Sequence, residues 1–463
     1  MKRQTWSSQL TYILTVAGAT IGFGATWRFP YLVGENGGGA YVLTFVIAMI
    51  LVGIPVILVE NVIGRRMHTN SVDAFGGKVG GKEIPKIWKI LGYMGMLGSF
   101  GIMAYYMVIG GWVISYITNI FGGMFGVAGG LDLSSPITDK VTSSFYEQSI
   151  ENSPLQIGFY TLIFVAINWF ILRKGIIDGI EKSVKYLMPL LFLCLIGMVV
   201  RNLTLDGAME GVKFYLTPNF SAISGKLFLD VLGQVFFALS LGFGVMITLS
   251  SHLSKEENLL KTATITSIVN TLIAVLAGFM IFPSLFSAGL QPDSSPLFYG
   301  PSLVFKTLPI AFSQMHFGNL YAIVFFTLLI IAALTTSLTI YQVIISVLQE
   351  KFNLSRRAAI NITLLTIFVL GNIPSVLTYG PWSDIRIFGR NIFDAFDFIS
   401  GNIFFILTAL GSTIFVGWVL KSDALKEFNN GSENPSKISV FWLWYVRFII
   451  PVVIIAIFIS GLK

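Results

Sequence analysis

The sequence predicts an all-α polytopic membrane protein with 11 transmembrane helices. Two features of the 463-residue chain support this class: hydrophobic residues make up 54% of it, and charged residues only 11%, whereas a soluble chain carries about 25% charged residues. A chain with so little charge cannot keep a water-exposed surface soluble, so lipid is the solvent for most of the protein. Soluble enzymes and disordered chains are therefore excluded.

The transmembrane helices follow from the apolar stretches, because a spanning helix needs roughly 20 mostly apolar residues. Backbone polar groups in lipid must pair internally, and the alternating pattern of membrane strands is absent from the sequence, so these stretches are expected to be helices. The expected spans are approximately 9–32, 39–62, 88–121, 155–172, 183–201, 227–250, 261–287, 318–349, 357–378, 392–420 and 438–460.

Basic residues predict the orientation of these spans. Of the 30 Lys and Arg residues, 20 lie in segments on the side of the N-terminus, eight lie on the other side, and Arg28 and Arg447 lie within or at the ends of spans. Because cytoplasmic loops are rich in Lys and Arg, the N-terminus is expected inside and the C-terminus outside. The net charge of +7 comes from short, scattered clusters, so no nucleic-acid partner is expected.

Two connections on the outer side are longer than the others. The polar segment 122–154 is expected to form a surface excursion. The segment 286–317 carries four prolines among apolar residues. Loops of this length usually have a function, so this segment is expected to pack as a lid.

A pair of glycine-rich interruptions is the most informative pattern in the chain. Gly22-Phe23-Gly24 lies within the first span, and Gly242-Phe243-Gly244 lies within the sixth. Glycine costs about 1 kcal/mol in a helix relative to alanine, and unwound backbone in lipid is tolerated only where it lines a cavity. Matching interruptions in two halves indicate a transporter site at the bilayer midplane. Close helix packing through small residues is the alternative interpretation.

The positions of the interruptions also predict the domain organisation. Each lies in the first helix of a block of five, and five helices per block give the two blocks opposite membrane orientations. We expect a single transporter domain over 1–463, with an inverted repeat at about 9–201 and 227–420. An extra helix at about 438–460 follows the second repeat.

Three charged residues lie within or at the edge of apolar stretches, where charge is expensive and usually functional. Arg28 follows the first interruption, and Asp397 begins the tenth span. Both are expected near the outer ends of their helices, where they could form a closing ion pair above the cavity. Glu60, near the inner end of the second span, is either a structural hydrogen-bond hub or a transport residue.

Several motifs resemble the neurotransmitter:sodium symporter family, and in particular its bacterial amino-acid transporters. The resemblance runs from about Trp6 to the end of the last span, and the twelfth helix that is usual in the family is missing. The motifs are Trp27-Arg28-Phe29-Pro30-Tyr31, Glu35-Asn36-Gly37-Gly38-Gly39-Ala40-Tyr41, Gly53-Ile54-Pro55 and Ser240-Leu241-Gly242-Phe243-Gly244.

The resemblance implies a sodium-coupled secondary symporter, not an enzyme, that imports an amino acid by alternating access. The substrate carboxylate would meet the backbone N–H groups of Phe23 and Gly24 and the Tyr106 hydroxyl, at a positive helix end. Monoamine members of the family carry an Asp at the position of Gly22, so an amino acid is favoured over an amine. The implied substrate-binding residues are Ala19, Thr20, Gly22, Phe23, Gly24, Ile102, Tyr106, Phe237, Ala238, Ser240, Phe243, Thr336, Ser337 and Ile340.

The substrate ammonium would meet carbonyls at Thr20, Phe237 and Ala238 together with the Ser240 hydroxyl. Aliphatic residues, one phenylalanine and no charge would surround the substrate side chain, so the resemblance implies an apolar amino acid. Which amino acid it is does not follow from the sequence.

Sodium prefers oxygen ligands. The resemblance implies two sodium sites, one of which has lost ligands that the family has and one of which has kept them. In the one that we call the altered sodium site, Ala25 and Ala238 stand where the family has Asn and Thr. Thr20, Ala238 and Asn270 remain there as a weakened site, in which the Thr20 hydroxyl could partly substitute for the lost oxygens. A single-sodium or proton-coupled symporter is therefore the alternative function. The other, which we call the intact sodium site, comprises Gly18, Ile21, Ala332, Thr335 and Thr336.

Chloride dependence is not expected, because Phe45 and Ala274 replace polar residues of the family's chloride site, although Gln234 is retained. The implied partners are the amino acid and the lipid bilayer of a bacterial cytoplasmic membrane, and the oligomeric state does not follow from the sequence. The implied gate residues are Arg28 and Asp397 outside, and Arg3, Trp6 and Glu350 inside.

Overall fold

Long apolar helices account for the architecture, and the predicted all-α membrane class is confirmed. The computed structural model describes residues 5–291, 300, 302–430 and 436–462. Within these residues, ten helices are long and apolar enough to cross a membrane. The one remaining expected span, the sixth at 227–250, is divided by a non-helical stretch at 239–244. The grouping of the spans into two inverted repeats stays a prediction.

The first half of the chain supplies five spans, some of which contain a π-helical turn. Two short strands also occur here, as a hairpin between the second and third spans that the sequence did not predict. The elements are α1 (Gln9–Phe23), α2 (Phe29–Glu35), α3 (Gly39–Ala48), α4 (Ile54–Met67), β1 (Lys78–Val79), β2 (Lys82–Glu83), α5 (Lys89–Met124), α6 (Asp139–Tyr146), α7 (Pro154–Leu172), α8 (Lys182–Leu203) and α9 (Ala208–Leu216).

The second half begins with the divided span and ends with a long helix that is mostly exposed to the surroundings. Its elements are α10 (Gly225–Ala238), α11 (Val245–Ser250), α12 (Leu259–Ser287), α13 (Leu308–Ser313), α14 (Gly318–Phe352), α15 (Arg356–Ile367), α16 (Ile373–Leu377), α17 (Ile392–Phe398), α18 (Ile406–Ile414), α19 (Ser422–Phe428) and α20 (Lys437–Gly461).

Side-chain caps fix where several helices begin. The Ser8 hydroxyl accepts a hydrogen bond from the Thr11 N–H, and the Thr11 hydroxyl oxygen accepts one from the Ser8 N–H, so α1 begins with a capping box. The side chains of Ser224, Asn258 and Asn391 each accept one backbone N–H and so cap α10, α12 and α17. Each cap satisfies an N–H group that would otherwise lack a partner at the end of a helix.

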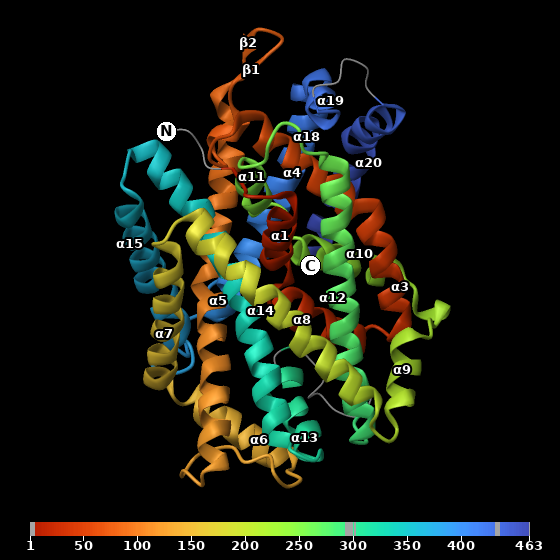
Figure 1. Ribbon diagram of the computed structural model, residues 1–463, viewed down its shortest axis with the longest axis vertical. Helices are drawn as coiled ribbons and strands as arrows, with labels where there is room; N and C mark the ends of the chain where they lie inside the picture. The colour runs from red at the N-terminus through yellow and green to blue at the C-terminus, as the bar shows by residue number, and fades with distance from the viewer. Residues whose placement is uncertain (1–4, 292–299, 301, 431–435, 463) are drawn as a thin grey trace.

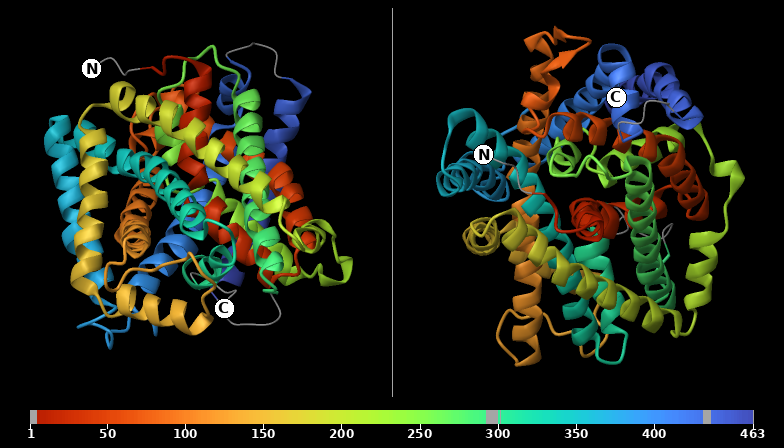
Figure 2. Two further views of the ribbon diagram at one scale, coloured as in Figure 1. Left: turned by 60° about the horizontal axis from the view of Figure 1, so that its bottom comes forward. Right: turned by 45° about the horizontal axis from the view of Figure 1, so that its top comes forward.

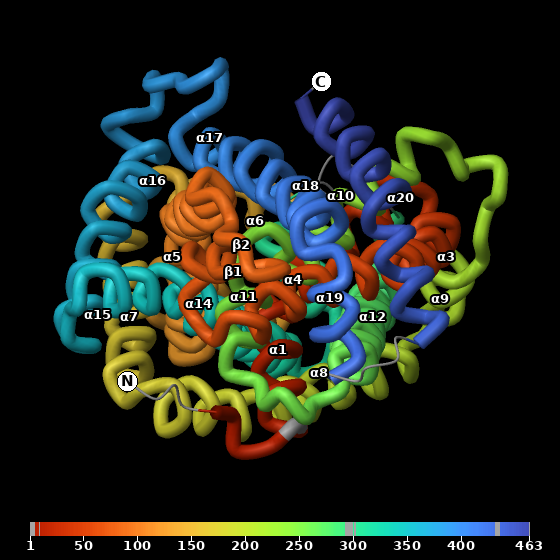
Figure 3. Tube along the Cα trace, turned by 90° about the horizontal axis from the view of Figure 1, so that it is seen from above, coloured from red at the N-terminus to blue at the C-terminus, as the bar shows by residue number. Residues whose placement is uncertain are grey.

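The first helix lies inside a ring of other helices, as the right view of Figure 2 shows for the red segment. It packs against α14 and α12, and 83% of its most apolar window is buried, against 28% for α20. In the view from above, α20 lies at one edge of the molecule and α15 and α7 lie at the opposite edge (Figure 3). The two interruptions are therefore positioned in the interior, with α20 on the periphery.

The two ends of the bundle carry different elements. The N-terminus, the β1–β2 hairpin and α19 lie at one end, and α6 and α13 lie at the other (Figure 1). The segment 122–154 contributes α6 to that second end, which fits the expected surface excursion. The described part of 286–317 forms a π-helical turn, Leu303–Thr307, and α13.

This second connection packs inward, as expected for a lid. Phe305 is 1% exposed and has ring contacts with Trp27 and Trp112 at centroid distances of 6.2 and 5.7 Å. The Tyr116 hydroxyl donates to the Phe305 carbonyl at 2.6 Å. Residues 302–313, which we call the outer lid, are thereby fixed to α5 and to the segment that follows α1.

Candidate functional site

The first interruption is a backbone break at Gly22. This residue has φ −28° and ψ −157°, which are not helical values, and a π-helical turn from Gly24 to Arg28 follows it. A Cβ atom at position 22 would collide with the Tyr106 hydroxyl and with Thr336 Oγ1. Glycine is needed here because α5 and α14 both approach the backbone closely.

The second interruption separates α10 from α11. Ser240, Gly242 and Gly244 have φ values of +52°, +81° and +76°, which lie in the left-handed region that favours glycine. The Glu60 Oε1 atom accepts a hydrogen bond from the Gly242 N–H at 2.6 Å. The Ser240 hydroxyl donates to the Ala19 carbonyl at 3.2 Å, so the two breaks are in direct contact.

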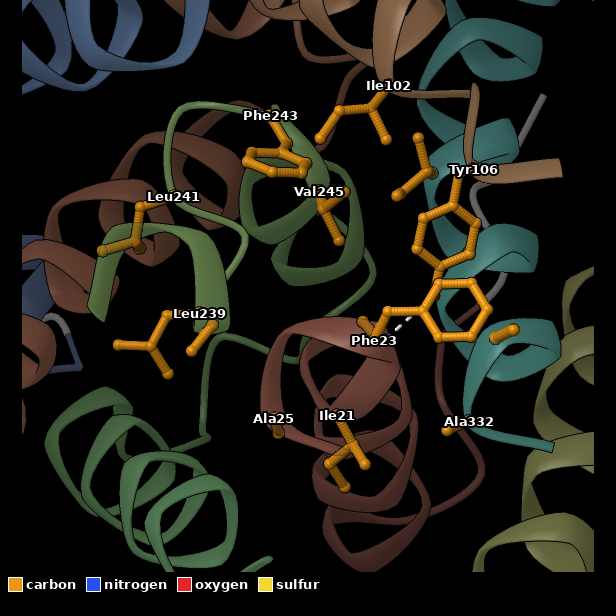
Figure 4. Packing of buried hydrophobic residues seen from close by; sticks show 14 of the residues in the cluster. Ile21, Phe23, Ala25, Ile102, Tyr106, Leu239, Leu241, Phe243, Val245 and Ala332 are labelled. Carbon is orange, nitrogen blue, oxygen red and sulfur yellow. Dashed lines mark hydrogen bonds between the residues drawn. The ribbon is translucent and has the colours of Figure 1, made fainter. Parts of the chain in front are cut away.

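A small cavity of about 280 Å³ lies where the breaks meet. Figure 4 shows Phe23, Ile102, Tyr106 and Phe243 around this space. All of the lining residues are uncharged, and all of them belong to the substrate-binding set that the resemblance implies. They are Ala19, Thr20, Gly22, Phe23, Gly24, Ile102, Tyr106, Phe237, Ser240, Phe243, Thr336 and Ile340.

Two members of the implied substrate-binding set do not line the cavity. Ala238 is fully buried, and its carbonyl accepts a hydrogen bond from Asn270. The Ser337 hydroxyl donates to Asn168 Oδ1 at 2.7 Å and is committed to α7. Successive residues of a helix point about 100° apart, which explains why Thr336 reaches the cavity and Ser337 does not.

Polar groups in the cavity are concentrated at the first break. The Phe23 N–H donates to the Tyr106 hydroxyl at 3.4 Å, and the Gly22 N–H donates to Thr336 Oγ1 at 3.0 Å. The dashed line in Figure 4 marks the contact between Phe23 and Tyr106. Both N–H groups face side-chain oxygens rather than the carbonyls of a regular helix, so they are placed to meet a ligand that carries acceptors.

The residues of the intact sodium site lie together between α1 and α14. The Thr336 hydroxyl donates to the Gly18 carbonyl at 2.9 Å, and the Thr335 hydroxyl donates to the Ala332 carbonyl at 3.0 Å. Ile21, Ala332 and Thr335 are fully buried. A Cβ atom at Gly18 would lie 3.1 Å from Thr335 Cβ, which shows how closely the helices approach. A hydroxyl keeps acceptor lone pairs while it donates, so these oxygens suit a hard cation.

The residues of the altered sodium site are also brought together, but without the lost oxygens. The Asn270 Nδ2 atom donates to the carbonyls of Thr20 and Ala238, both at 3.1 Å. Ala25 and Ala238 are fully buried and contribute only methyl groups to their surroundings.

The region of the family's chloride site is apolar in this chain. Phe45 packs against Phe29 with a centroid distance of 4.6 Å, and Ala274 is fully buried. The retained Gln234 uses its amide Nε2 atom to donate to the Gly24 carbonyl at 2.7 Å. The expectation that chloride has no role stays a prediction.

The two residues that the sequence predicts as the outer gate, Arg28 and Asp397, do not meet in this conformation. Arg28 lies over the Phe237 ring at 4.4 Å, while Asp397 accepts a hydrogen bond from the Tyr105 hydroxyl at 2.5 Å. Within the part of the chain that the structure describes, no ion pair within 4.0 Å joins Arg28 and Asp397. The expected closing pair is therefore open here.

A larger hollow of about 830 Å³ lies next to Arg28, between α10, α20 and the π-helical segment Ile399–Phe405. Phe237 and Phe243 line both this hollow and the small cavity. Phe243 stacks on Phe405 at a centroid distance of 3.5 Å. Phe405 was not expected at the site, because one phenylalanine in an apolar span carries no distinguishing signal.

Two of the residues that the sequence predicts at the inner gate, Arg3 and Trp6, belong to the segment before α1. Arg3 lies outside the described residues. The Trp6 indole N–H donates to the Leu249 carbonyl at 3.0 Å, and its ring packs edge-on against His252 at 6.0 Å. Because Trp6 is only 9% exposed, it covers the end of α11 on the side of the N-terminus.

Glu350 is held by the loop that follows α4. Its Oε2 atom accepts hydrogen bonds from the Asn70 N–H at 2.8 Å and from the Thr69 hydroxyl at 3.0 Å. In the same loop, burial disfavours the charged form of Asp73, but hydrogen bonds from Lys89 and Asn70 outweigh burial and lower the pKa of Asp73. The loop thus ties the end of α4, the start of α5 and the end of α14 together.

The fold and the site together define a class of protein. Paired discontinuous helices that meet at a cavity within the membrane are typical of secondary transporters, whose substrates bind at such breaks. The chain matches the model of the sodium:neurotransmitter symporter family over residues 3–127 and 139–463, and it belongs to that family. Sodium-coupled transport is therefore its class of activity.

Several proteins resemble the chain over almost its whole length. An uncharacterized sodium-dependent transporter of Haemophilus influenzae is 63% identical over 100% of this chain and 98% of its own. The uncharacterized sodium-dependent transporter YhdH of Bacillus subtilis is 37% identical over 98% and 97%. The crystal structure of MhsT in complex with L-phenylalanine matches with a TM-score of 0.86 and 36% identity, over 99% of this chain and 100% of that one.

Proposed function

We propose that this chain imports an apolar amino acid into the cell together with sodium, by alternating access. The uncharged cavity at the meeting point of the two breaks carries this proposal. No charged side chain lines it, so a substrate that is charged at both ends must be held by backbone groups and hydroxyls. The cavity is also small, which favours a small substrate.

The substrate carboxylate is assigned to the first break. The Phe23 N–H and the Tyr106 hydroxyl lie 3.4 Å apart at this point, and both can donate to a carboxylate oxygen. N–H groups at the start of a helix, such as the one that follows the break, favour an anion. A Cβ atom at Gly22 would collide with Tyr106 and Thr336, so the site has no room for an acidic side chain that would bind an amine.

The substrate side chain is assigned to the opposite part of the cavity. Ile102, Phe243 and Ile340 line it there, and they offer only apolar surface. An apolar side chain gains about 25 cal/mol per Å² of surface that it buries, whereas a charged one would be desolvated without a partner. The structure of MhsT contains L-phenylalanine, which is consistent with a substrate of this type.

The intact sodium site links substrate binding to the movement of α1. Sodium bound to the oxygens of Gly18, Thr335 and Thr336 would hold α1 against α14. When α1 moves away, the site loses its ligands on one side and releases the ion. The membrane potential adds about 2.3 kcal/mol per charge per 100 mV to the sodium gradient.

Uptake into proteoliposomes tests the proposal. We expect an inward sodium gradient to drive accumulation of at least one apolar amino acid from a labelled panel that also includes charged amino acids and monoamines. Equal uptake with potassium or choline in place of sodium would refute sodium coupling. Preferred uptake of an amine or of a charged amino acid would refute the substrate class.

Neighbouring residues on α14 supply matched variants for this assay. Thr336→Ala removes an oxygen that contacts the Gly18 carbonyl at 2.9 Å and the Gly22 N–H at 3.0 Å. We expect it to weaken sodium and substrate affinity at least about tenfold, because one such hydrogen bond is worth about 1 kcal/mol and the change affects two. Ser337→Ala removes a hydroxyl that bonds to Asn168, and the affinities should stay within about twofold of wild type.

A further inference from the structure

The Asn270 side chain connects the two broken helices. It extends from α12, and its Nδ2 atom donates at 3.1 Å to the Thr20 carbonyl, just before the first break, and at 3.1 Å to the Ala238 carbonyl, at the end of α10. Asn270 is fully buried. One amide group therefore donates hydrogen bonds to two carbonyls that have no N–H partner in their own helix, because each helix ends there.

The neighbouring groups determine the orientation of this amide. Two carbonyl oxygens face it, and only the NH₂ end of an asparagine can donate to both. The opposite orientation would place three oxygens together with no proton between them. In the described part of the chain, the Asn270 Oδ1 atom has no hydrogen-bond partner. The two carbonyl contacts thus outweigh the cost of one unsatisfied oxygen.

A sodium ion at this position would need Asn270 to turn its oxygen toward the same carbonyls. It would then have three oxygen ligands, because Ala25 and Ala238 supply methyl groups. The Thr20 hydroxyl is turned back along α1, where its oxygen lies 3.0 Å from the carbonyl oxygens of Val16 and Ala17, and it would add at most a fourth oxygen. Three or four ligands are few for a hard cation buried away from water. The intact sodium site, in contrast, has five.

We propose that the Asn270 amide takes the place of the first sodium ion of the family, so that one sodium ion is coupled to each imported amino acid. A positive ion and an NH₂ group both attract carbonyl oxygens, and either can join the two breaks. The amide does so without leaving the protein during the cycle. This inference rests on the proposed function, and it specifies the sodium stoichiometry of the same site.

The equilibrium accumulation ratio measures this stoichiometry directly. In proteoliposomes clamped at zero membrane potential, a tenfold sodium gradient balances an amino-acid gradient of about tenfold if one sodium is coupled, and of about a hundredfold if two are coupled. We expect the tenfold ratio for the wild-type protein. A ratio near a hundredfold would overturn the inference. Absence of any sodium-driven accumulation would instead refute the proposed function, so the two failures are distinguishable.

Two variants test the role of the missing oxygens and of the amide. Ala25→Asn combined with Ala238→Thr restores the lost ligands, and the ratio should rise toward a hundredfold. If an active double variant still gives an accumulation ratio of about tenfold, the loss of those two side-chain oxygens is not the reason for a one-sodium stoichiometry. Asn270→Ala should lower the uptake rate but keep the tenfold ratio, because no ion is lost. If either variant fails to fold, the wild-type ratio alone still decides between one ion and two.

Discussion

Glu60 shows how a single buried residue maintains the second break. Its side chain is fully buried, and its Oε1 atom accepts the Gly242 N–H at 2.6 Å. Gly242 is left-handed, so its N–H cannot join a regular helix and needs another acceptor. Of the two roles that the sequence left open for Glu60, this contact favours the structural hub.

Substitution of Glu60 separates the two roles. Glu60→Gln keeps an acceptor for Gly242 in nearly the same volume, and we expect sodium-driven uptake within about threefold of wild type with an unchanged pH profile. Glu60→Ala leaves the buried N–H unpaired, at a cost of about 1–3 kcal/mol, and should lower both the melting temperature and the uptake. A pH profile that changes in Glu60→Gln, or uptake that is lost there, would identify Glu60 as a proton carrier.

For single residues, the sequence predicts where the helices break better than it predicts which way a side chain points. Gly22 and Gly242 were predicted as breaks because the cost of glycine in a helix is local. Ser337 was placed in the cavity, although its hydroxyl bonds to Asn168 on α7, and that contact depends on how two distant helices pack. The Asn270 amide could be counted as a possible ligand from the sequence, but its orientation depends on carbonyls from α1 and α10.

The outer lid is the element whose packing offers the clearest test. Phe305 is buried among aromatic rings of α5 and of the segment after α1. Phe305→Ala would leave a cavity, and such changes typically cost about 3–5 kcal/mol. We expect a lower melting temperature in detergent and faster exchange of bound substrate, because the lid would be held less firmly against α5 and Trp27.

An exposed phenylalanine of the same connection provides the control. Phe317 is 73% exposed, so Phe317→Ala should leave the melting temperature and the exchange rate close to those of the wild type. Comparable losses in both variants would show that the effect is not due to the packing of Phe305. An unchanged exchange rate in a destabilised Phe305→Ala protein would show that the lid does not limit substrate exit.

The spans were predictable as elements because each is long and apolar. The span expected at 88–121 is α5, Lys89–Met124, and the span expected at 438–460 is α20, Lys437–Gly461. What could not be predicted is local: the π-helical turns within spans, and the hairpin over Lys78–Glu83. These features depend on neighbouring helices and on two-residue pairings, which leave no periodic signal in the sequence.

For the whole molecule, the distribution of charge predicts the topology, with the N-terminus inside and the C-terminus outside. Different elements lie at the two ends of the bundle. The β1–β2 hairpin lies at one end, and α6 lies at the opposite end (Figure 1). Lys82 in the hairpin and Lys140 in α6 are both exposed. If basic loops face the cytoplasm, the two residues must be accessible from opposite sides of the membrane.

Cysteine labelling tests this topology with little background, because Cys194 is the single cysteine of the chain. In a Cys194→Ala protein, we expect Lys140→Cys to react with a membrane-impermeant maleimide in intact bacterial cells. Lys82→Cys should react only in inside-out vesicles or after permeabilisation. Each variant is the control for the other, since both positions are exposed and differ only in side. The reverse pattern would invert the assigned direction of transport, and reaction of both in intact cells would contradict a membrane crossing between them.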